Sequence, residues 1–580
     1  MTRSPRPSPT CFRGTAARLA PVLLLLLLVP ACGDGDRWAG MPDFCQAVLP
    51  EVEAFLEAHP QPEGDRFGGR AVVGGGGEIA GGMNAFVSAD YAANQHQLHV
   101  NLMTLLRLDE ELEPEPWLAE AWELSEDGTE LEFRIRDDVL WHDGTPTTAH
   151  DVAFTFLRVT DPETGFPNAA FWRHYVEGEG GVEVVDDHTI RFRLHPHAGP
   201  LNPWFSVAVM PRHLLEDVPP AELRQHPYGN RCPVGNGPFV FRDHQQDASW
   251  TFRRNPAFPE GLGGPAPLEH YVYRVIPEQT TLLTELLTGG VDVYIGPSPD
   301  QVPQIEAADH LEVHDFLSRN YDFVGWNTRR PHLSDVRVRR ALTLGTNRQQ
   351  IVDALLRGYG TVANSGVPPF HPAYMQALED SLAHDPERAA RLLDEAGWTL
   401  PEGGDIRTNA DGEPLEISLQ FNVENQMRRD IAEIMQAQLR EVGVAIRPEG
   451  VEFASLINLI NDPQVRDFDG VVVGWVTDFR VDDHDLFHST RADTPYGWSG
   501  IADDRLDVLL DTLQLVQDLE EAAPFWEEYQ LRLVELQPYT WLYFPERLAG
   551  TNRRLHGAEP DVRGEWANIH RWWVMDTESP

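Results

Sequence analysis

The sequence predicts an α/β protein of two or three domains. Gly470 to Val473 form a short apolar run rich in β-branched residues, which is typical of a strand buried on both faces. A helix is predicted to begin after Asp385 as N-cap, with Pro386 at its first position and Gly397 as its stop. The length of 580 residues suits two or three domains.

The N-terminus has the layout of an export signal. Four arginines and no acidic residue precede the apolar run at 22–29, which is short for a membrane span. The run ends in Val29-Pro30-Ala31-Cys32, which resembles a bacterial lipobox. We therefore predict a signal peptide at 1–31 and a lipid on Cys32, with cleavage without lipid or an uncleaved anchor as the alternatives. Residues 32–66 are then a tether and a short helical spacer broken at Pro50.

Composition excludes several functions. The formal net charge is −45, which argues against nucleic acid as a partner because phosphate binding relies on basic patches. The sequence contains no lysine, which rules out a Schiff-base or P-loop lysine. Either a salty habitat or a GC-rich genome could account for this composition. Beyond Cys32 the mature chain has only Cys45 and Cys232, and an export compartment would allow them to pair, but their separation leaves the bond open.

The stretch from 112 to 158 combines several local signals. It contains a turn at Asp127-Gly128, an alternating strand at Leu131, Phe133 and Ile135, and a helix capped by Thr148. Its full text is LEPEPWLAEAWELSEDGTELEFRIRDDVLWHDGTPTTAHDVAFTFLR. In the order of these motifs, the stretch closely resembles the signature of the bacterial extracellular solute-binding proteins of family 5, the oligopeptide and dipeptide receptors of ABC importers.

The resemblance continues in order along the chain, over roughly residues 67–575. The matching segments are VEVVDDHTIRFRL, PVGNGPFVF with RRNPAF, LLTELLTGGVDVYIG, DVRVRRALTLGTNRQQIVDALLRGYG and DPERAARLLDEAGW. The resemblance implies a two-lobed periplasmic-binding-protein fold of cluster C type, with an extra β-rich subdomain and a hinge between the lobes. Its expected parts are lobe I (67–107, 200–317 and 547–575), the inserted β-rich subdomain (108–199) and lobe II (318–546).

The same resemblance implies a function. It implies a monomeric receptor that encloses a solute, with an oligopeptide as the favoured ligand, and delivers it to the permease subunits of an ABC transporter. The protein would be exported and lipid-anchored to the cell membrane, facing the periplasm or the cell exterior. No enzymatic role, cofactor, metal or nucleic acid is expected.

The stretch DFDGVVVGWVTDFRVDDHD (467–485) carries the predicted ligand site. In peptide-binding relatives this strand end lies in the cleft, so the resemblance implies that the backbones of Gly474 and Val476 bind an extended peptide. Trp475 would line a side-chain pocket, and Asp478 would pair with the peptide's N-terminal ammonium. Asp90-Tyr91-Ala92 align with the facing strand of the other lobe. Tyr496 and Trp498 add aromatic surface to the pocket wall.

Other ligands and functions stay open. The loop FRVDDHDLF has Asp483 where the family has proline, so a nickel complex, haem, opine or oligosaccharide is an alternative ligand. A metal site or metal enzyme would use Asp482, Asp483, His484, Asp485 and His488, because His484 and His488 stand at i and i+4. That segment lacks a Glu-x-x-His pattern, and acidic clusters are usually solvated. A serine hydrolase is disfavoured because no Gly-x-Ser-x-Gly elbow occurs.

Overall fold

The computed structural model describes residues 38, 40–87, 90–167, 169–197 and 199–574. The predicted signal peptide and the predicted lipid site at Cys32 lie outside these residues. Within the described part of the chain, no helix is both long and apolar enough to span a membrane.

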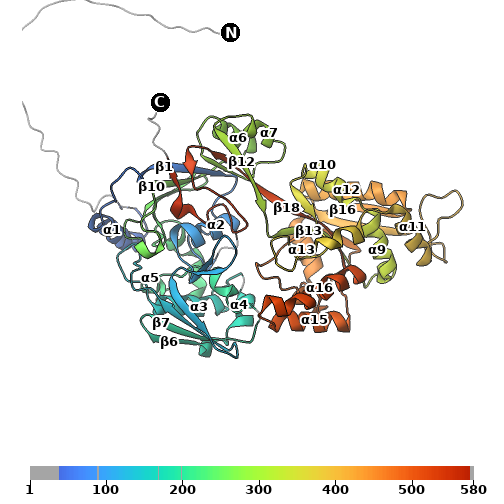
Figure 1. Ribbon diagram of the computed structural model, residues 1–580, viewed down its shortest axis with the longest axis horizontal. Coiled ribbons are helices and arrows are strands. Elements are labelled where there is room, and N and C mark those ends of the chain that lie inside the picture. The colour runs from blue at the N-terminus through green and yellow to red at the C-terminus, as the bar shows by residue number, and fades with distance from the viewer. Residues whose placement is uncertain (1–37, 39, 88–89, 168, 198, 575–580) are drawn as a thin grey trace, which may run out of the picture.

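Two lobes share one mixed sheet of twelve strands (Figure 1). Its main path runs β16-β15-β17-β13-β18-β11-β1-β10-β9-β8, and β12 and β14 also pair with β18. The strands are β1 (Gly68–Gly75), β8 (Phe239–Gln245), β9 (Ser249–Arg254), β10 (Leu268–Val275), β11 (Val293–Ile295), β12 (Leu311–Leu317), β13 (Asn320–Trp326), β14 (Gly360–Val362), β15 (Glu416–Asn422), β16 (Ala445–Val451), β17 (Gly470–Val476) and β18 (Tyr539–Asn552). This two-lobed α/β arrangement confirms the predicted fold class.

Strand β18 belongs to both lobes. Its residues 539–543 pair with β13, whereas residues 546–552 pair with β12. The chain also passes between the lobes at the short connection from β12 to β13. The two passages are adjacent, because Leu317 at the end of β12 pairs with Glu546 of β18. In Figure 1 these extended segments lie between the two bodies.

The second lobe has a core on each face of its sheet. Successive side chains along β13 and β17 point to opposite faces, and both faces carry apolar side chains. Val324 and Val472 pack into one core, and Phe323 and Val473 pack into the other. The first face is covered by α9 (Val336–Gly345), α10 (Arg348–Leu355), α11 (Pro386–Glu395) and α12 (Gln426–Glu441). The second face is covered by α13 (Phe453–Asn461), α15 (Asp504–Leu515) and α16 (Leu519–Leu536).

A separate four-stranded sheet packs against the first lobe. Its order is β4-β5-β7-β6, and helices α3 and α4 lie next to it. The bounds are β4 (Ala119–Leu124), β5 (Glu130–Ile135), β6 (Val182–Asp186), β7 (Thr189–Arg193), α3 (Ala149–Thr160) and α4 (Ala169–Tyr175). The predicted alternation in β5 is confirmed, because Leu131, Phe133 and Ile135 are buried. Thr148 caps α3 in a capping box with Asp151.

Helix α1 (Asp43–Ala58) corrects one expectation. Pro50 was expected to break this segment, yet it lies inside a continuous helix of 16 residues. The helix tolerates the lost backbone N–H because its apolar face, including Val48, Val52 and Phe55, is buried against the body. Cys45 on this helix forms a disulfide with Cys232, with Cα atoms 5.5 Å apart. This bond, which the sequence left open, ties the spacer to the first lobe.

The helix at 386–395 follows its predicted local chemistry. The Asp385 carboxylate accepts a hydrogen bond from the Arg388 N–H at 2.8 Å, and Pro386 is the first helical residue. Gly397 has a φ of +89°, a conformation that side chains disfavour, and it stops the helix.

The remaining elements are short. The strands are β2 (Leu106–Leu108), β3 (Pro114–Pro116), β19 (Leu555–His556) and β20 (Trp573–Val574). The α-helices are α2 (Tyr91–His96), α5 (Arg212–Leu215), α6 (Gln279–Leu287), α7 (Val302–Glu306), α8 (Pro331–Ser334) and α14 (His484–Phe487). One π-helical turn is η2 (Gln97–Asn101), and the 3₁₀ turns are η3 (Glu179–Gly181), η4 (Asn202–Phe205), η5 (Pro220–Gln225), η6 (Pro227–Gly229), η7 (Glu260–Leu262), η8 (Gln376–Leu382), η9 (Ser489–Arg491) and η10 (Ile569–Arg571).

Candidate functional site

Near the end of strand β17, the backbone N–H and C=O groups of two residues point away from the partner strand β13. The two strands are antiparallel, and the Thr477 N–H donates to the Arg319 carbonyl at 2.9 Å. Hydrogen-bonded and non-bonded pairs alternate along such a ladder. Trp475 therefore points its backbone groups toward β13, whereas Gly474 and Val476 point theirs away from it.

The outward edge at Gly474 and Val476 has no strand partner in the described part of the chain. β17 pairs with β15 on that side, but the pairing stops at Gln420↔Val471. The Val476 side chain is also 58% exposed. An open strand edge of this kind can accept another extended chain, whose main-chain groups would satisfy the unpaired N–H and C=O groups.

Gly474 has a steric reason to be glycine. A Cβ at this position would lie 3.1 Å from Asp322 Oδ1 and 3.2 Å from Arg428 Nη2, which is a tight contact on both sides. Asp322 and Arg428 form an ion pair of 3.6 Å beneath the strand. Burial raises the pKa of Asp322 to about 6, although Arg428 acts in the opposite direction.

The structure brings the three predicted aromatic residues together. The Trp475 ring lies 5.4 Å from the Tyr496 ring and 5.7 Å from the Trp498 ring, both in edge-to-face geometry. Tyr496 is 40% exposed, so it can contact a ligand. Trp498 differs from the expectation of exposed surface, because it is 4% exposed and donates its indole N–H to Asn461. It supports Trp475 from the core side.

Asp478 follows the strand and is open to solvent. Its side chain is 55% exposed, and its Oδ1 lies 4.0 Å from Arg319 Nη1. The surrounding protein removes part of the water from this carboxylate and so raises the pKa of Asp478, with Arg319 opposing and Asp482 adding to the rise. A loosely paired carboxylate beside an open strand edge can receive a cationic group.

The predicted residues of the other lobe adopt a different local structure. Asp90, Tyr91 and Ala92 were expected on a strand, but Asp90 is the N-cap of helix α2 and accepts from the Ala93 N–H at 3.0 Å. Aspartate is among the strongest N-cap residues, which explains the start of a helix here. The Tyr91 hydroxyl donates to Glu565 at 2.6 Å.

Three functional candidates were missed from the sequence. Glu565 is 2% exposed and pairs with Arg547 at 2.8 Å, and the Arg547 guanidinium lies 3.9 Å from the centre of the Tyr91 ring. Arg319 is the third. Burial raises the pKa of Tyr91, and the positive charge of Arg319 opposes this rise, as it does at Asp478. Arg319 therefore lies within electrostatic reach of both predicted halves of the site. The sequence held one indication that Arg319 could be functional, namely its position in the link between β12 and β13.

The second lobe touches the inserted subdomain at the loop after Asp478. Asp482 Oδ2 lies 3.4 Å from His197 Nε2, and the Gln517 side chain donates to the His197 carbonyl at 3.4 Å. In Figure 1, α15 and α16 accordingly lie beside α4.

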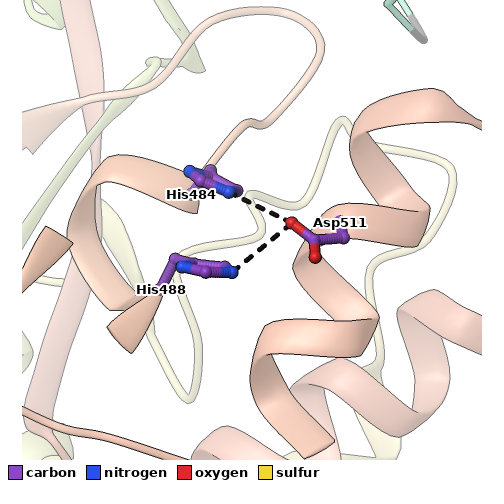
Figure 2. A group of neighbouring side chains, drawn as sticks. All are labelled: His484, His488 and Asp511. Carbon is purple, nitrogen blue, oxygen red and sulfur yellow. Dashed lines mark hydrogen bonds and ion pairs between the residues drawn. The ribbon is translucent and has the colours of Figure 1, made fainter. Parts of the chain in front are cut away.

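The fold directs the acidic residues that were considered as a metal site toward different partners. Asp482 faces His197, Asp483 is buried and accepts from the Tyr529 hydroxyl at 2.5 Å, and Asp485 pairs with Arg491 at 3.3 Å. Only His484 and His488 stay together, and they face Asp511 of α15 (Figure 2).

The chain is similar in sequence to a known protein family and to several characterised proteins. Residues 113–498 match the family model described as bacterial extracellular solute-binding proteins, family 5 Middle. The oligopeptide-binding protein AppA of Bacillus subtilis is 28% identical over 511 residues, which cover 87% of this chain and 92% of AppA. The nickel-binding periplasmic protein of Escherichia coli is 29% identical over 349 residues, covering 59% and 64%.

Solved structures agree on the fold. The structure of B. subtilis AppA in complex with a nonapeptide superposes with a TM-score of 0.72 at 27% identity, covering 88% of this chain and 100% of that chain. The structure of NikZ from Campylobacter jejuni with Ni(L-His) superposes with a TM-score of 0.69 at 22% identity, covering 88% and 100%. The second likeness concerns the fold alone.

Proposed function

Because the chain belongs to the bacterial extracellular solute-binding proteins of family 5, we propose that it binds an extended oligopeptide between its lobes and delivers it to an ABC transporter permease. The likeness to oligopeptide-binding AppA over most of both chains supports this ligand class. The main structural support is the open backbone edge at Gly474 and Val476, which ends beside Asp478.

The spacing of these groups suits a peptide. Gly474 and Val476 are two residues apart, so their outward groups repeat at about 7 Å, which is the two-residue repeat of an extended partner chain. Backbone pairing at this edge accepts any side chain, while Trp475 and Tyr496 provide an aromatic contact for one of them. Asp478, two residues beyond Val476, receives the N-terminal ammonium. This arrangement binds many peptides of different sequence.

The first lobe completes the site in this proposal. Asp90, Tyr91 and Ala92 approach the ligand from the start of α2, with Tyr91 held by Glu565 and Arg547. Residues 318–546 then move as lobe II relative to lobe I (67–107, 200–317 and 547–575) and the inserted subdomain (108–199). The adjacent passages at β12–β13 and in β18 act as the hinge.

The cellular setting belongs to the same proposal. The protein is exported by the signal at 1–31, is anchored to the membrane through a lipid on Cys32, and acts as a monomer. It releases its cargo unchanged to the permease and has no enzymatic activity.

Mass spectrometry of the native protein tests the ligand class. Protein purified without denaturation should release peptides of mixed sequence, because the backbone edge does not select side chains. Recovery of an oligosaccharide, opine, haem or nickel complex instead would reject the peptide proposal. Small-angle scattering tests closure separately, since the radius of gyration should decrease on binding. An unchanged radius in protein shown to bind peptide would reject the hinge mechanism.

A further inference from the structure

We propose that His484, His488 and Asp511 form a binding site for one divalent transition-metal ion of the zinc type. His484 begins α14, His488 follows its last residue, and Asp511 lies on α15, so the site joins two elements of the second lobe. Figure 2 shows both imidazole rings directed at the Asp511 carboxylate. The site uses none of the residues assigned above to the ligand.

The distances fit three ligands around a metal better than direct hydrogen bonds. His484 Nε2 and His488 Nε2 lie 3.3 and 3.4 Å from the same oxygen, Asp511 Oδ1. Hydrogen bonds between nitrogen and a carboxylate oxygen are usually about 2.7–2.9 Å when charge-assisted. Tetrahedral zinc with bonds of about 2.0–2.1 Å holds neighbouring ligand atoms about 3.3 Å apart. All three ligand atoms lie within 4.8 Å of one another.

The surroundings orient the two imidazoles. The rings are stacked, with centroids 4.3 Å apart and planes 17° from parallel. His488 Nδ1 lies 2.7 Å from the Thr490 hydroxyl and 3.2 Å from the Thr490 N–H. The Thr490 N–H donates to His488 Nδ1, so Nδ1 accepts in this structure. Metal binding at Nε2 would move the proton to Nδ1, which would then donate to the Thr490 hydroxyl and give up the contact with the Thr490 N–H; such an outer contact commonly fixes a metal-bound histidine. Asp507 Oδ1 also lies 4.0 Å from His488 Nε2, but this carboxylate accepts from the Ser489 N–H and O–H groups and is not counted among the proposed ligands.

Exposure leaves room for a metal with an open position. The His484 and His488 side chains are 12% and 9% exposed, whereas Asp511 is 61% exposed. Solvent can therefore supply the fourth ligand on the Asp511 side. Two imidazoles and one carboxylate favour Zn²⁺, Ni²⁺ or Cu²⁺ over Mg²⁺ or Ca²⁺, which prefer oxygen ligands only. The sequence prediction of no metal did not consider Asp511.

A metal here would join α14 to α15 next to the contact between the second lobe and the inserted subdomain. Asp482, two residues before His484, accepts from Gln514 of α15 at 3.2 Å and faces His197 of the other body. The ion would fix the loop that carries Asp482, without taking part in ligand binding at the β17 edge.

Zinc titration of chelator-stripped protein tests the proposal. Isothermal calorimetry is performed in a large excess of Mg²⁺, which saturates the acidic surface. We expect one Zn²⁺ per chain, and X-ray absorption should show two nitrogen ligands at about 2.0–2.1 Å. His488→Gln and Asp511→Asn should each weaken zinc binding at least about tenfold, since even outer contacts contribute that much. Asp511 is exposed, so its variant should fold.

His150→Gln is the matched control. His150 is an exposed histidine that pairs with one carboxylate, Asp187 at 3.3 Å, and among the residues that the structure describes no third ligand completes a cluster there. Its loss should leave zinc affinity and stoichiometry unchanged. The proposal is overturned if zinc does not bind saturably under these conditions. It is equally overturned if the Asp511 and His488 variants bind zinc as tightly as the parent protein, which would show adventitious binding to the acidic surface.

Discussion

Replacing Asp478 by asparagine tests the proposed ammonium site most directly. The change keeps size and polarity but removes the charge. One charge pair at about 4 Å contributes about 4 kcal/mol at an effective dielectric constant of about 20. Arg319, already 4.0 Å from Asp478, competes for the carboxylate and reduces the gain on binding. We therefore expect a loss of about 2–4 kcal/mol, within the range for one-sided removal of a hydrogen-bonded charge pair.

The expected change in affinity is large enough to measure. At about 1.4 kcal/mol per tenfold, the loss corresponds to a roughly 30- to 700-fold weaker Kd. Calorimetry with one peptide, free and N-acetylated, against both proteins gives a double-mutant cycle. Acetylation should weaken binding strongly in the parent protein and much less in Asp478→Asn, because both changes remove the same ion pair. Asp467→Asn is the control, since it removes an exposed aspartate paired with Arg330 before the opposite end of β17.

Additivity would refute the reasoning. If the penalties of acetylation and of Asp478→Asn simply add, the carboxylate and the ammonium do not interact. The peptide's N-terminus would then lie elsewhere, and the orientation of the peptide along β17 would have to be reversed or shifted.

Three other changes have defined outcomes. Replacing Cys45 and Cys232 by alanine should lower the free energy of unfolding by about 2–5 kcal/mol, because the disulfide closes a separation of 187 residues; equal denaturant midpoints would contradict this. Burial raises the pKa of Asp322 to about 6 from 3.8, so the folded state binds the extra proton and this group's contribution to stability falls as pH rises from about 4 to 6. The fall should approach about 3 kcal/mol relative to Asp322→Asn, measured by urea unfolding across this pH range, and parallel pH profiles would contradict it. Cys32→Ser should release the protein from membranes into the soluble fraction, and unchanged membrane retention would argue against lipidation.

Local chemistry predicted several elements from the sequence. The β-branched run at 470–473 became the buried start of β17, and the Asp385 cap and Gly397 stop define α11. These features depend on neighbours within one turn or strand, so a single sequence contains them. Pro50 shows the limit of such rules, because tertiary burial of the α1 face overrides the local helix-breaking tendency.

Long-range relations could not be predicted in the same way. Asp90 was placed on a strand by alignment to the family, whereas its capping of Ala93 starts a helix. The pairing of Cys45 with Cys232 needed the position of α1. Asp511 lies 27 residues beyond His484, on another helix, so only the packing of α15 could bring it to the two histidines.

The sharing of β18 between the lobes also sets an order of assembly. The second lobe is one continuous stretch, and all its strands have been synthesised once 539–543 are present to pair with β13. The first lobe must wait longer, because β11 pairs with 549–551 and β12 with 546–552. As the chain grows from its N-terminus onward, β1 and β10 can pair early, but β18, which completes their sheet by pairing with β11 and β12, comes only at the end. The lobe whose strands are made first is therefore the last to be completed.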